Sequence, residues 1–114
     1  MCIFCKIINN EVPCQKVYED KDVLAFLDIH PKSNGHTLVV PKKHSENIFD
    51  IPNSDLQKVI DVAQKISLDL KHKNNLQAVN LLNSSGAWAG QEVMHYHLHI
   101  IPRYENDGLS IFGM

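Results

Sequence analysis

Residues 95–101 read His95-Tyr96-His97-Leu98-His99-Ile100-Ile101, so histidines alternate with apolar residues along this stretch. Successive side chains of a β-strand point to opposite faces of its sheet. The pattern predicts a strand over Met94–Pro102 that presents all three imidazoles on one face. Tyr96, Leu98 and Ile100 are then expected to enter the core from the other face.

Four further strands are predicted in the sequence before this stretch. Apolar and β-branched residues bounded by turn-forming residues indicate strands at Gln15–Glu19, Val23–Asp28 and His36–Pro41, which suggest an antiparallel meander. A fourth strand is predicted at Gln77–Asn83, and the loop Ser84–Gln91, rich in small residues, joins it to the histidine strand. We therefore expect an antiparallel sheet of about five strands.

Two helices complete the predicted α+β fold. Apolar residues at Ile3, Phe4, Ile7 and Ile8 indicate a short N-terminal helix over Cys2–Asn9. A long helix is predicted to begin after an N-cap at Asn53 or Ser54 and to end around His72–Asn75, because its apolar residues follow a period near 3.6. One face of this helix is expected to cover the sheet.

Composition restricts the class of protein. The 114 residues fit a single domain, 1–114, and 44% apolar with 21% charged residues is ordinary for a soluble globular chain. A net charge of −2 with scattered lysines argues against a nucleic acid polymer as partner. No apolar run is long enough to span a bilayer, and no signal peptide is recognisable, so we expect a cytoplasmic protein without a membrane partner.

The histidine stretch admits three interpretations. It could be a solvated strand face, a metal site in which His95, His97 and His99 share one ion, or a nucleophilic histidine steered by its neighbours. The third is favoured by Gly90-Gln91-Glu92-Val93, where backbone N–H groups and an amide side chain can approach an anionic oxygen closely. A neutral imidazole can attack phosphorus if its other nitrogen is held as a donor.

The segment Gly90–Ile101 resembles the signature of the histidine-triad (HIT) family, His-x-His-x-His followed by two apolar residues. The resemblance extends over nearly the whole chain. Other matching segments are Cys2–Ile8, Val23–Ile29, Gly35–His44 and Ile101–Arg103. It implies a purine nucleotide hydrolase that releases a nucleoside monophosphate from a phosphoramidate or a dinucleoside polyphosphate.

The resemblance also implies roles for individual residues. His97 would be the nucleophile that carries the nucleotide, His99 would contact phosphate oxygens, and the carbonyl of His95 would fix the tautomer of His97. The α-phosphate would be held by Gly90, Asn83, Gln91 and the backbone N–H of Val93. Asp28 would bind the ribose hydroxyls, and an apolar slot would take the base: Ile3, Phe4, Ile7, Phe26 and Ile29.

Glu92 departs from the family members that cleave phosphoramidates, because they carry a serine at this position that helps to protonate the leaving amine. Both substrate classes therefore stay open.

The resemblance further implies a homodimer built on the long helix and an edge strand. The tail from Tyr104 to Met114, with Leu109, Ile111 and Phe112, is expected to reach the neighbouring subunit.

Cys2 and Cys5 have the C-x-x-C spacing, which places both sulfurs within reach of one ion on a helix. By resemblance to bacterial members of the family, His44 and His95 would complete a structural zinc site. The alternatives are two unrelated buried cysteines or, less in keeping with the surrounding pattern, a redox pair. Cys14 has no predicted role.

A rival function keeps the nucleotide pocket in a binding or interaction module with vestigial hydrolysis. A second rival is the metalloenzyme in which all three histidines of the triad bind one metal. Measuring turnover of added substrate would distinguish a hydrolase from a binding module. Removing metal with a chelator would abolish the activity of a metalloenzyme at once.

Overall fold

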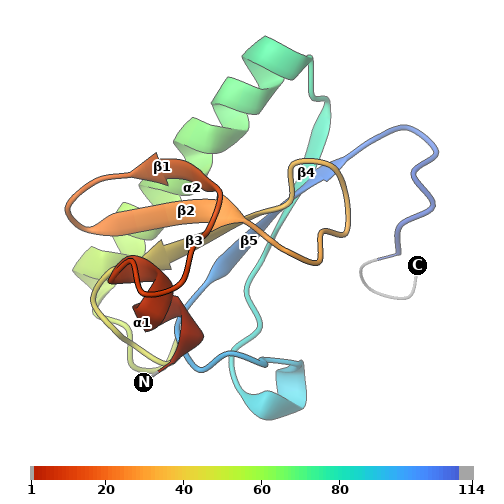
Figure 1. Ribbon diagram of the computed structural model, residues 1–114. Coiled ribbons are helices and arrows are strands. Elements are labelled where there is room, and N and C mark those ends of the chain that lie inside the picture. Colours follow the sequence, from red (N-terminus) through yellow and green to blue (C-terminus); the bar gives the residue numbers. More distant parts are fainter. Residues whose placement is uncertain (1, 111–114) are drawn as a thin grey trace.

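A computed structural model describes residues 2–110 and confirms the α+β class (Figure 1). Two α-helices, a short 3-10 turn and five strands follow one another along the chain. Their bounds are α1 Ile3–Ile8, β1 Lys16–Glu19, β2 Val23–Leu27, β3 Thr37–Pro41, α2 Asn53–Asn74, β4 Ala78–Leu82, η1 Ala87–Ala89 and β5 Leu98–Arg103. Each predicted element is present, within a few residues of its expected limits.

The strands form one antiparallel sheet in the order β1-β2-β3-β5-β4. The first three strands are the predicted meander, and β5 lies between β3 and β4 through the pairs Leu38↔His99 and Leu82↔His99. The strand that carries His99 is therefore central, and β1 and β4 are the edges of the sheet.

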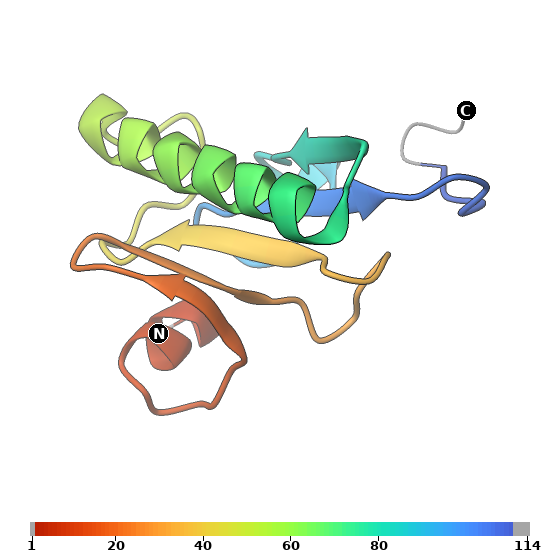
Figure 2. The same cartoon turned by 90° about the horizontal axis from the view of Figure 1, so that it is seen from above.

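The two faces of the sheet carry different helices (Figure 2). Alternate residues of the strands pack with α2 on one face, where Val59, Ala63 and Ile100 are fully buried. The opposite face packs with α1, through Phe4, Ile7 and Phe26. Tyr96, Leu98 and Ile100 all belong to the α2 side, as the alternation predicted.

The strand expected at Met94–Pro102 begins only at Leu98 and ends at Arg103. Residues 93–97 are irregular, with a bend at 93–95, because their backbone groups bond to loops instead of a neighbouring strand. The N–H of Tyr96 donates to Ser45 O at 2.7 Å, and Gln91 Nε2 donates to Val93 O at 3.0 Å. Pairing of β3 with β5 stops at Val39↔Leu98, and Pro41, farther along β3, has no N–H to offer.

The N-cap predicted at Asn53 or Ser54 is also corrected. The cap residue is Pro52, whose side chain cannot accept a hydrogen bond, and Asn53 is already helical. Asn53 Oδ1 instead accepts from Gln57 Nε2 at 2.7 Å, one turn along α2. The C-terminus agrees with the prediction, since Asn75 adopts the left-handed conformation that ends helices. Neither helix in residues 2–110 combines the length and apolar character needed to cross a membrane.

Candidate active site and metal site

The three histidines of the triad face α1, although only His99 lies in a regular strand. His95 is fully buried and His97 is 8% exposed. The Phe4 ring lies edge-on to both, with centroid distances of 6.0 Å to His95 and 5.2 Å to His97. The rings of His97 and His99 are 5.0 Å apart. The helix therefore clamps the histidine segment from the side opposite the main core.

Hydrogen bonding fixes the tautomer of His97. Its Nδ1 lies 2.8 Å from the carbonyl oxygen of His95. A carbonyl only accepts, so Nδ1 carries the proton and Nε2 keeps its lone pair. The predicted bond between these two residues is thus present, and the free nitrogen of His97 belongs to a side chain that lines a pocket.

A second chain of hydrogen bonds fixes His99 through His36. The backbone N–H of Lys32 donates to His36 Nδ1 at 3.0 Å, which leaves the proton of neutral His36 on Nε2. His36 Nε2 lies 2.9 Å from His99 Nδ1 and donates to it. His99 therefore carries its own proton on Nε2. The site combines one imidazole nitrogen with a lone pair and another that donates.

Burial keeps these imidazoles uncharged. It is the main cause that lowers the pKa of His97, against the opposing effects of the bond to His95 and of the Asp28 charge. Burial, followed by the His97 and His36 rings, lowers the pKa of His99 to about 4. Burial also lowers the pKa of His36. At neutral pH His97 is thus in the form that can act as a nucleophile.

A pocket of about 490 Å³ opens on His97 and His99. Most of the predicted substrate-binding residues line it together: Ile3, Phe4, Ile7, Phe26, Asp28, Ile29, Gly90 and Val93. Two of the predicted base-slot residues are not core residues, since Ile3 is 44% and Ile29 85% exposed. An apolar end next to two imidazoles and a carboxylate is suited to a nucleotide.

The Asp28 carboxylate lies at the end of β2, beside the pocket histidines. Its Oδ1 accepts from the backbone N–H of His30 at 2.9 Å, and its Oδ2 lies 3.6 Å from His36 Nε2. The turn predicted for Asp28 is therefore present. Its Oδ2 has no closer partner among residues 2–110 and can accept a hydrogen bond from a ligand.

Asn83 and Gln91 are not among the residues that line this pocket, and their amides bond to backbone groups. Asn83 Nδ2 donates to the carbonyl of His97 at 3.0 Å. Gln91 is 5% exposed, and its Nε2 donates to Glu46 O at 2.6 Å and to Val93 O at 3.0 Å. Its Oε1 accepts from the N–H of Gly86 at 2.7 Å. These amides hold the loop and the histidine segment in place.

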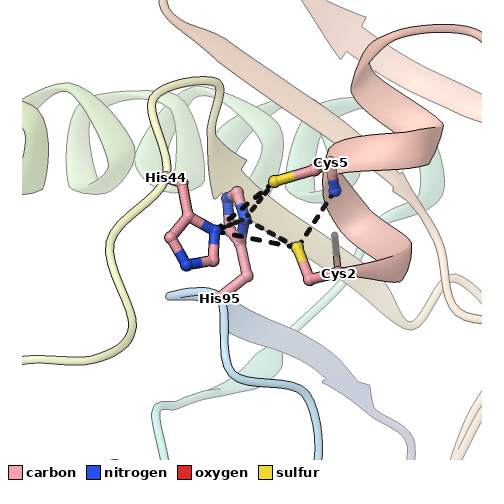
Figure 3. Close-up of side chains that lie close together, drawn as sticks. All are labelled: Cys2, Cys5, His44 and His95. Carbon is pink, nitrogen blue, oxygen red and sulfur yellow. Dashed lines mark hydrogen bonds between the residues drawn. The ribbon is translucent and has the colours of Figure 1, made fainter.

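Cys2, Cys5, His44 and His95 bring their ligand atoms together on the flank of α1 (Figure 3). The Nδ1 atom of His95 lies 3.3 Å from Cys2 Sγ and 3.5 Å from Cys5 Sγ, and that of His44 lies 3.7 and 3.4 Å away. The two Nδ1 atoms are 3.1 Å apart. Tetrahedral zinc with ordinary bond lengths requires about 3.6 Å between S and N and about 3.3 Å between N and N.

The chemistry of the donors agrees with these distances. His95 Nε2 lies 2.8 Å from the carbonyl of Pro41 and must donate to it, so Nδ1 turns a lone pair toward the thiols. Metal-bound histidines commonly donate their other N–H to a carbonyl in this way. The lone pairs of two sulfurs and two ring nitrogens converge on one point, where a cation would offset their mutual repulsion. The cluster therefore fits a zinc ion.

Asp28, His36 and His99 form a second close group, with ligand atoms within 4.8 Å of one another. The tautomers argue against a metal there. His36 Nδ1 accepts the N–H of Lys32, so its Nε2 carries a proton where the metal would have to bind. Within this group His36 and His99 are hydrogen-bonded at 2.9 Å, and the Asp28 carboxylate lies 3.6 Å from His36 Nε2.

Sequence reasoning assigned no role to His36, Lys32 or Ser84, and all three line the pocket. His36 is 1% exposed and joins His99 from 63 positions away. The position of His36 at the start of a predicted strand was the one feature of the sequence that could have drawn attention to it. Cys14, which had no predicted role, also lines the pocket. The part of the predicted tail that includes Ile111 and Phe112 lies outside the described residues.

Comparison with protein families matches residues 9–106 to the HIT domain. An HIT-like protein of Methanocaldococcus jannaschii is 54% identical over 95% of this chain and 83% of its own length. The adenosine 5'-monophosphoramidase HNT1 of Saccharomyces cerevisiae is 42% identical over 96% of this chain and 68% of its length. The adenylylsulfatase HINT3 of Arabidopsis thaliana is 43% identical over 95% of this chain and 55% of its length.

Solved structures are similar over the same extent. A HIT family protein from Bacillus anthracis superimposes with a TM-score of 0.90 and 51% identity, covering 96% of this chain and 78% of that one. A zinc-bound histidine triad family protein from Mycobacterium smegmatis gives a TM-score of 0.92 at 36% identity, covering 96% of this chain and 80% of that one.

Proposed function

Because this chain belongs to the HIT family, we propose that it is a nucleotide hydrolase that releases a nucleoside monophosphate by transfer through His97. Two relatives named for hydrolysis of adenylyl compounds, the yeast phosphoramidase and the plant adenylylsulfatase, support this class of reaction. The substrates that we propose are phosphoramidates and dinucleoside polyphosphates of a purine nucleoside.

One observation carries the proposal: His97 is a buried, neutral imidazole whose Nδ1 is held by the His95 carbonyl at 2.8 Å. Its Nε2 lone pair is therefore directed by the fold and needs no separate base. A nucleophile of this kind splits one difficult displacement at phosphorus into two easier steps.

In the first step His97 Nε2 forms a bond to the α-phosphorus, and the bond from phosphorus to the leaving group breaks. The leaving group keeps the electron pair and, if it is an amine, takes a proton from solvent. The ring becomes a nucleotidyl imidazolium, whose charge is stabilised because its Nδ1–H donates to the His95 carbonyl. In this proposal His99 Nε2–H donates to a phosphate oxygen.

In the second step water attacks phosphorus from the side that the leaving group has vacated. Its proton passes to solvent, the bond from phosphorus to Nε2 breaks, and the electron pair returns to His97. The products are a nucleoside monophosphate and the original neutral imidazole. No other side chain has to change its charge over the complete cycle.

The nucleoside is proposed to occupy the apolar end of the pocket. Phe4, Ile7 and Phe26 offer aliphatic and aromatic surfaces there, and the free Oδ2 of Asp28 can accept from a ribose hydroxyl. Gly90 and Val93 also line the pocket, and in this proposal the Val93 N–H would donate to the phosphate. Gly90 has φ +96°, which favours glycine at this point.

Zinc is proposed as a structural ion held by Cys2, Cys5, His44 and His95. When bound it supplies folding energy, because it fastens α1 to the loop after β3 and to the histidine segment. Cys2 Sγ already accepts from the N–H of Cys5 at 3.2 Å at the start of the helix. The ion would take no part in the attack on phosphorus. His95 presents its Nδ1 to the thiols and only its carbonyl oxygen to His97.

The test is to mix the protein with adenosine 5'-phosphoramidate and to measure release of AMP. Rapid quenching with substrate labelled at the α-phosphorus should trap the label on the protein. His97→Ala should abolish trapping and reduce turnover by about a thousandfold or more, while AMP still binds. A binding module with vestigial activity predicts AMP binding but no turnover by the unaltered protein. Full turnover by His97→Ala would overturn the nucleophile.

A further inference from the structure

The loop that joins β2 to β3, residues 28–36, supplies a large part of the wall of the pocket that opens on His97 and His99. Five of its residues line that pocket: Asp28, Ile29, His30, Lys32 and His36. The loop also holds the ring of His36, because the N–H of Lys32 donates to His36 Nδ1 at 3.0 Å. The conformation of this loop therefore affects both the pocket and the His36–His99 pair.

Two side-chain hydroxyls fasten the middle of this loop to the chain at the end of β5. Ser33 Oγ donates to the carbonyl of Pro102 at 2.7 Å, and Tyr104 Oη donates to the carbonyl of Asn34 at 2.6 Å. A Cβ added to Gly35 would lie 3.3 Å from Pro102 Cγ and 3.9 Å from Tyr104 Oη. The chain thus leaves β5 beside this loop, and residues 33–35 rest on it (Figure 1).

Asp107 fixes Tyr104 from the other side. Its Oδ2 accepts from the N–H of Tyr104 at 2.9 Å and from Arg103 Nε at 2.9 Å. Its Oδ1 accepts from Arg103 Nη2 at 3.0 Å and from the N–H of Leu109 at 2.9 Å. Arg103 Nη1 donates to Asn80 Oδ1 on β4 at 2.9 Å. Tyr104 therefore belongs to a turn that is closed on itself and bonded to the sheet, so its hydroxyl is a fixed point for the loop.

We propose that Tyr104 is a positioning residue for the reaction, which holds the 28–36 loop in the conformation that binds the nucleotide. The inference rests on the proposed function, because the loop carries Asp28, the proposed ribose ligand, and His36, which donates to His99 at 2.9 Å. Without the Tyr104 hydroxyl, the loop of the free protein leaves this conformation more often. The apparent affinity for a nucleotide falls in proportion to the share of protein that is ready to bind. A substrate that has bound and restored the loop reacts at the usual rate.

The experiment removes single hydroxyl groups and keeps the rest of each side chain. Tyr104→Phe and Ser33→Ala each delete one tie between the loop and the end of β5. Tyr18→Phe is the matched control, because the Tyr18 hydroxyl donates to Asp20 Oδ2 at 2.8 Å, in the turn between β1 and β2, and Tyr18 does not line the pocket. Three measurements are compared: hydrogen exchange of the loop amides with and without AMP, the Kd of AMP, and KM and kcat for adenosine 5'-phosphoramidate.

In Tyr104→Phe the Kd of AMP and the KM should each rise about fivefold, the loss expected for one hydrogen bond, while kcat changes by less than about twofold. Amides of residues 28–36 should exchange faster in the free variant and regain their protection in saturating AMP. Ser33→Ala should change the same quantities in the same direction. Tyr18→Phe should leave them as in the unaltered protein, even where its melting temperature falls.

A purely structural role of Tyr104 predicts a lower melting temperature with unchanged Kd, KM and loop exchange, and that result would overturn the inference. A fall in kcat at constant KM would overturn it too, because the hydroxyl would then act on the chemical step. If the unaltered protein binds AMP but hydrolyses nothing, the proposed function is wrong, and the AMP affinity and loop exchange still decide the role of Tyr104. If the unaltered protein does not bind AMP, both are overturned.

Discussion

Gln91 shows how one buried side chain positions the reaction pocket without entering it. Its amide joins three backbone groups, the N–H of Gly86 and the carbonyls of Glu46 and Val93. Replacement by Met keeps the length but leaves buried partners unsatisfied, so we expect Gln91→Met to lower the free energy of unfolding by about 2–3 kcal/mol. Turnover should fall as well, because the loop carries pocket residues. Urea denaturation and kcat/KM measure the two effects.

The matched control is Gln77→Met, since Gln77 is exposed and its amide bonds only to Asn75. This change should alter stability by less than about 0.5 kcal/mol. Equal effects of the two substitutions would contradict the positioning role of Gln91.

His99 links stability to pH. Burial, with the His97 and His36 rings, lowers its pKa from 6.5 to about 4 in the folded protein. The unfolded chain therefore binds a proton near pH 6.5 that the folded chain binds only near pH 4. The stability contributed by neutral His99 is full above pH 6.5 and is lost as the pH falls from 6.5 to 4.

We accordingly expect His99→Gln to lose less stability between pH 7 and pH 4.5 than the unaltered protein. Urea denaturation at the two pH values gives the difference directly. The interpretation fails if the acid-induced loss is the same in both proteins.

At the scale of elements, α1 depends on the cluster of Cys2, Cys5, His44 and His95. The helix has six residues, too few to be stable alone, and it contributes Ile3, Phe4 and Ile7 to the pocket. Cys5→Ser should therefore remove bound zinc, lower the melting temperature by roughly 10 °C or more, and weaken AMP binding about tenfold. Metal analysis, calorimetry and equilibrium binding measure these outcomes.

Cys14→Ser is the matched control, because Cys14 lies outside the cluster. It should retain zinc and melt close to the unaltered protein. Zinc retained at full stoichiometry by Cys5→Ser would rule out the proposed ligand set.

The elements themselves were largely predictable because side-chain periodicity is a local property. Alternation assigned Tyr96 and Ile100 to the core even though His95 and His97 precede the strand. The start of β5 was missed, since it depends on partners such as Ser45, 51 positions away, which take the N–H of Tyr96. The N-cap was predicted wrongly because the Asn53 side chain accepts a hydrogen bond from Gln57 Nε2, one helical turn along, instead of capping a backbone N–H.

The candidate site divides in the same way. His97 and its bond to the His95 carbonyl span two positions, so the motif contained them. The pairing of His36 with His99 spans 63 positions, and no local pattern announces it. The amides of Asn83 and Gln91 were expected to face phosphate because sequence gives the residue type near a pocket but not the direction of its donors.

At the scale of the whole molecule, the edge of the sheet at β4 leads us to predict a second copy. Strand β4 is an edge strand, and Leu81 on it is 44% exposed. Unpaired backbone groups on such an edge readily pair with another chain, and two-fold symmetry lets the same strand meet itself. Helix α2 adds exposed apolar residues at Ile60 and Leu68, with exposed fractions of 44% and 47%.

We expect the protein to sediment as a homodimer and Leu81→Glu to convert it to a monomer. The two introduced carboxylates would meet across the two-fold axis and would be buried without a cation. Val17→Glu is the matched control: Val17 is 43% exposed on β1, the opposite edge strand, and this variant should stay dimeric. Sedimentation velocity at micromolar concentration separates the two species. If the unaltered protein is a monomer, the predicted dimer does not exist. If Val17→Glu loses the dimer and Leu81→Glu keeps it, the contact does not lie at β4.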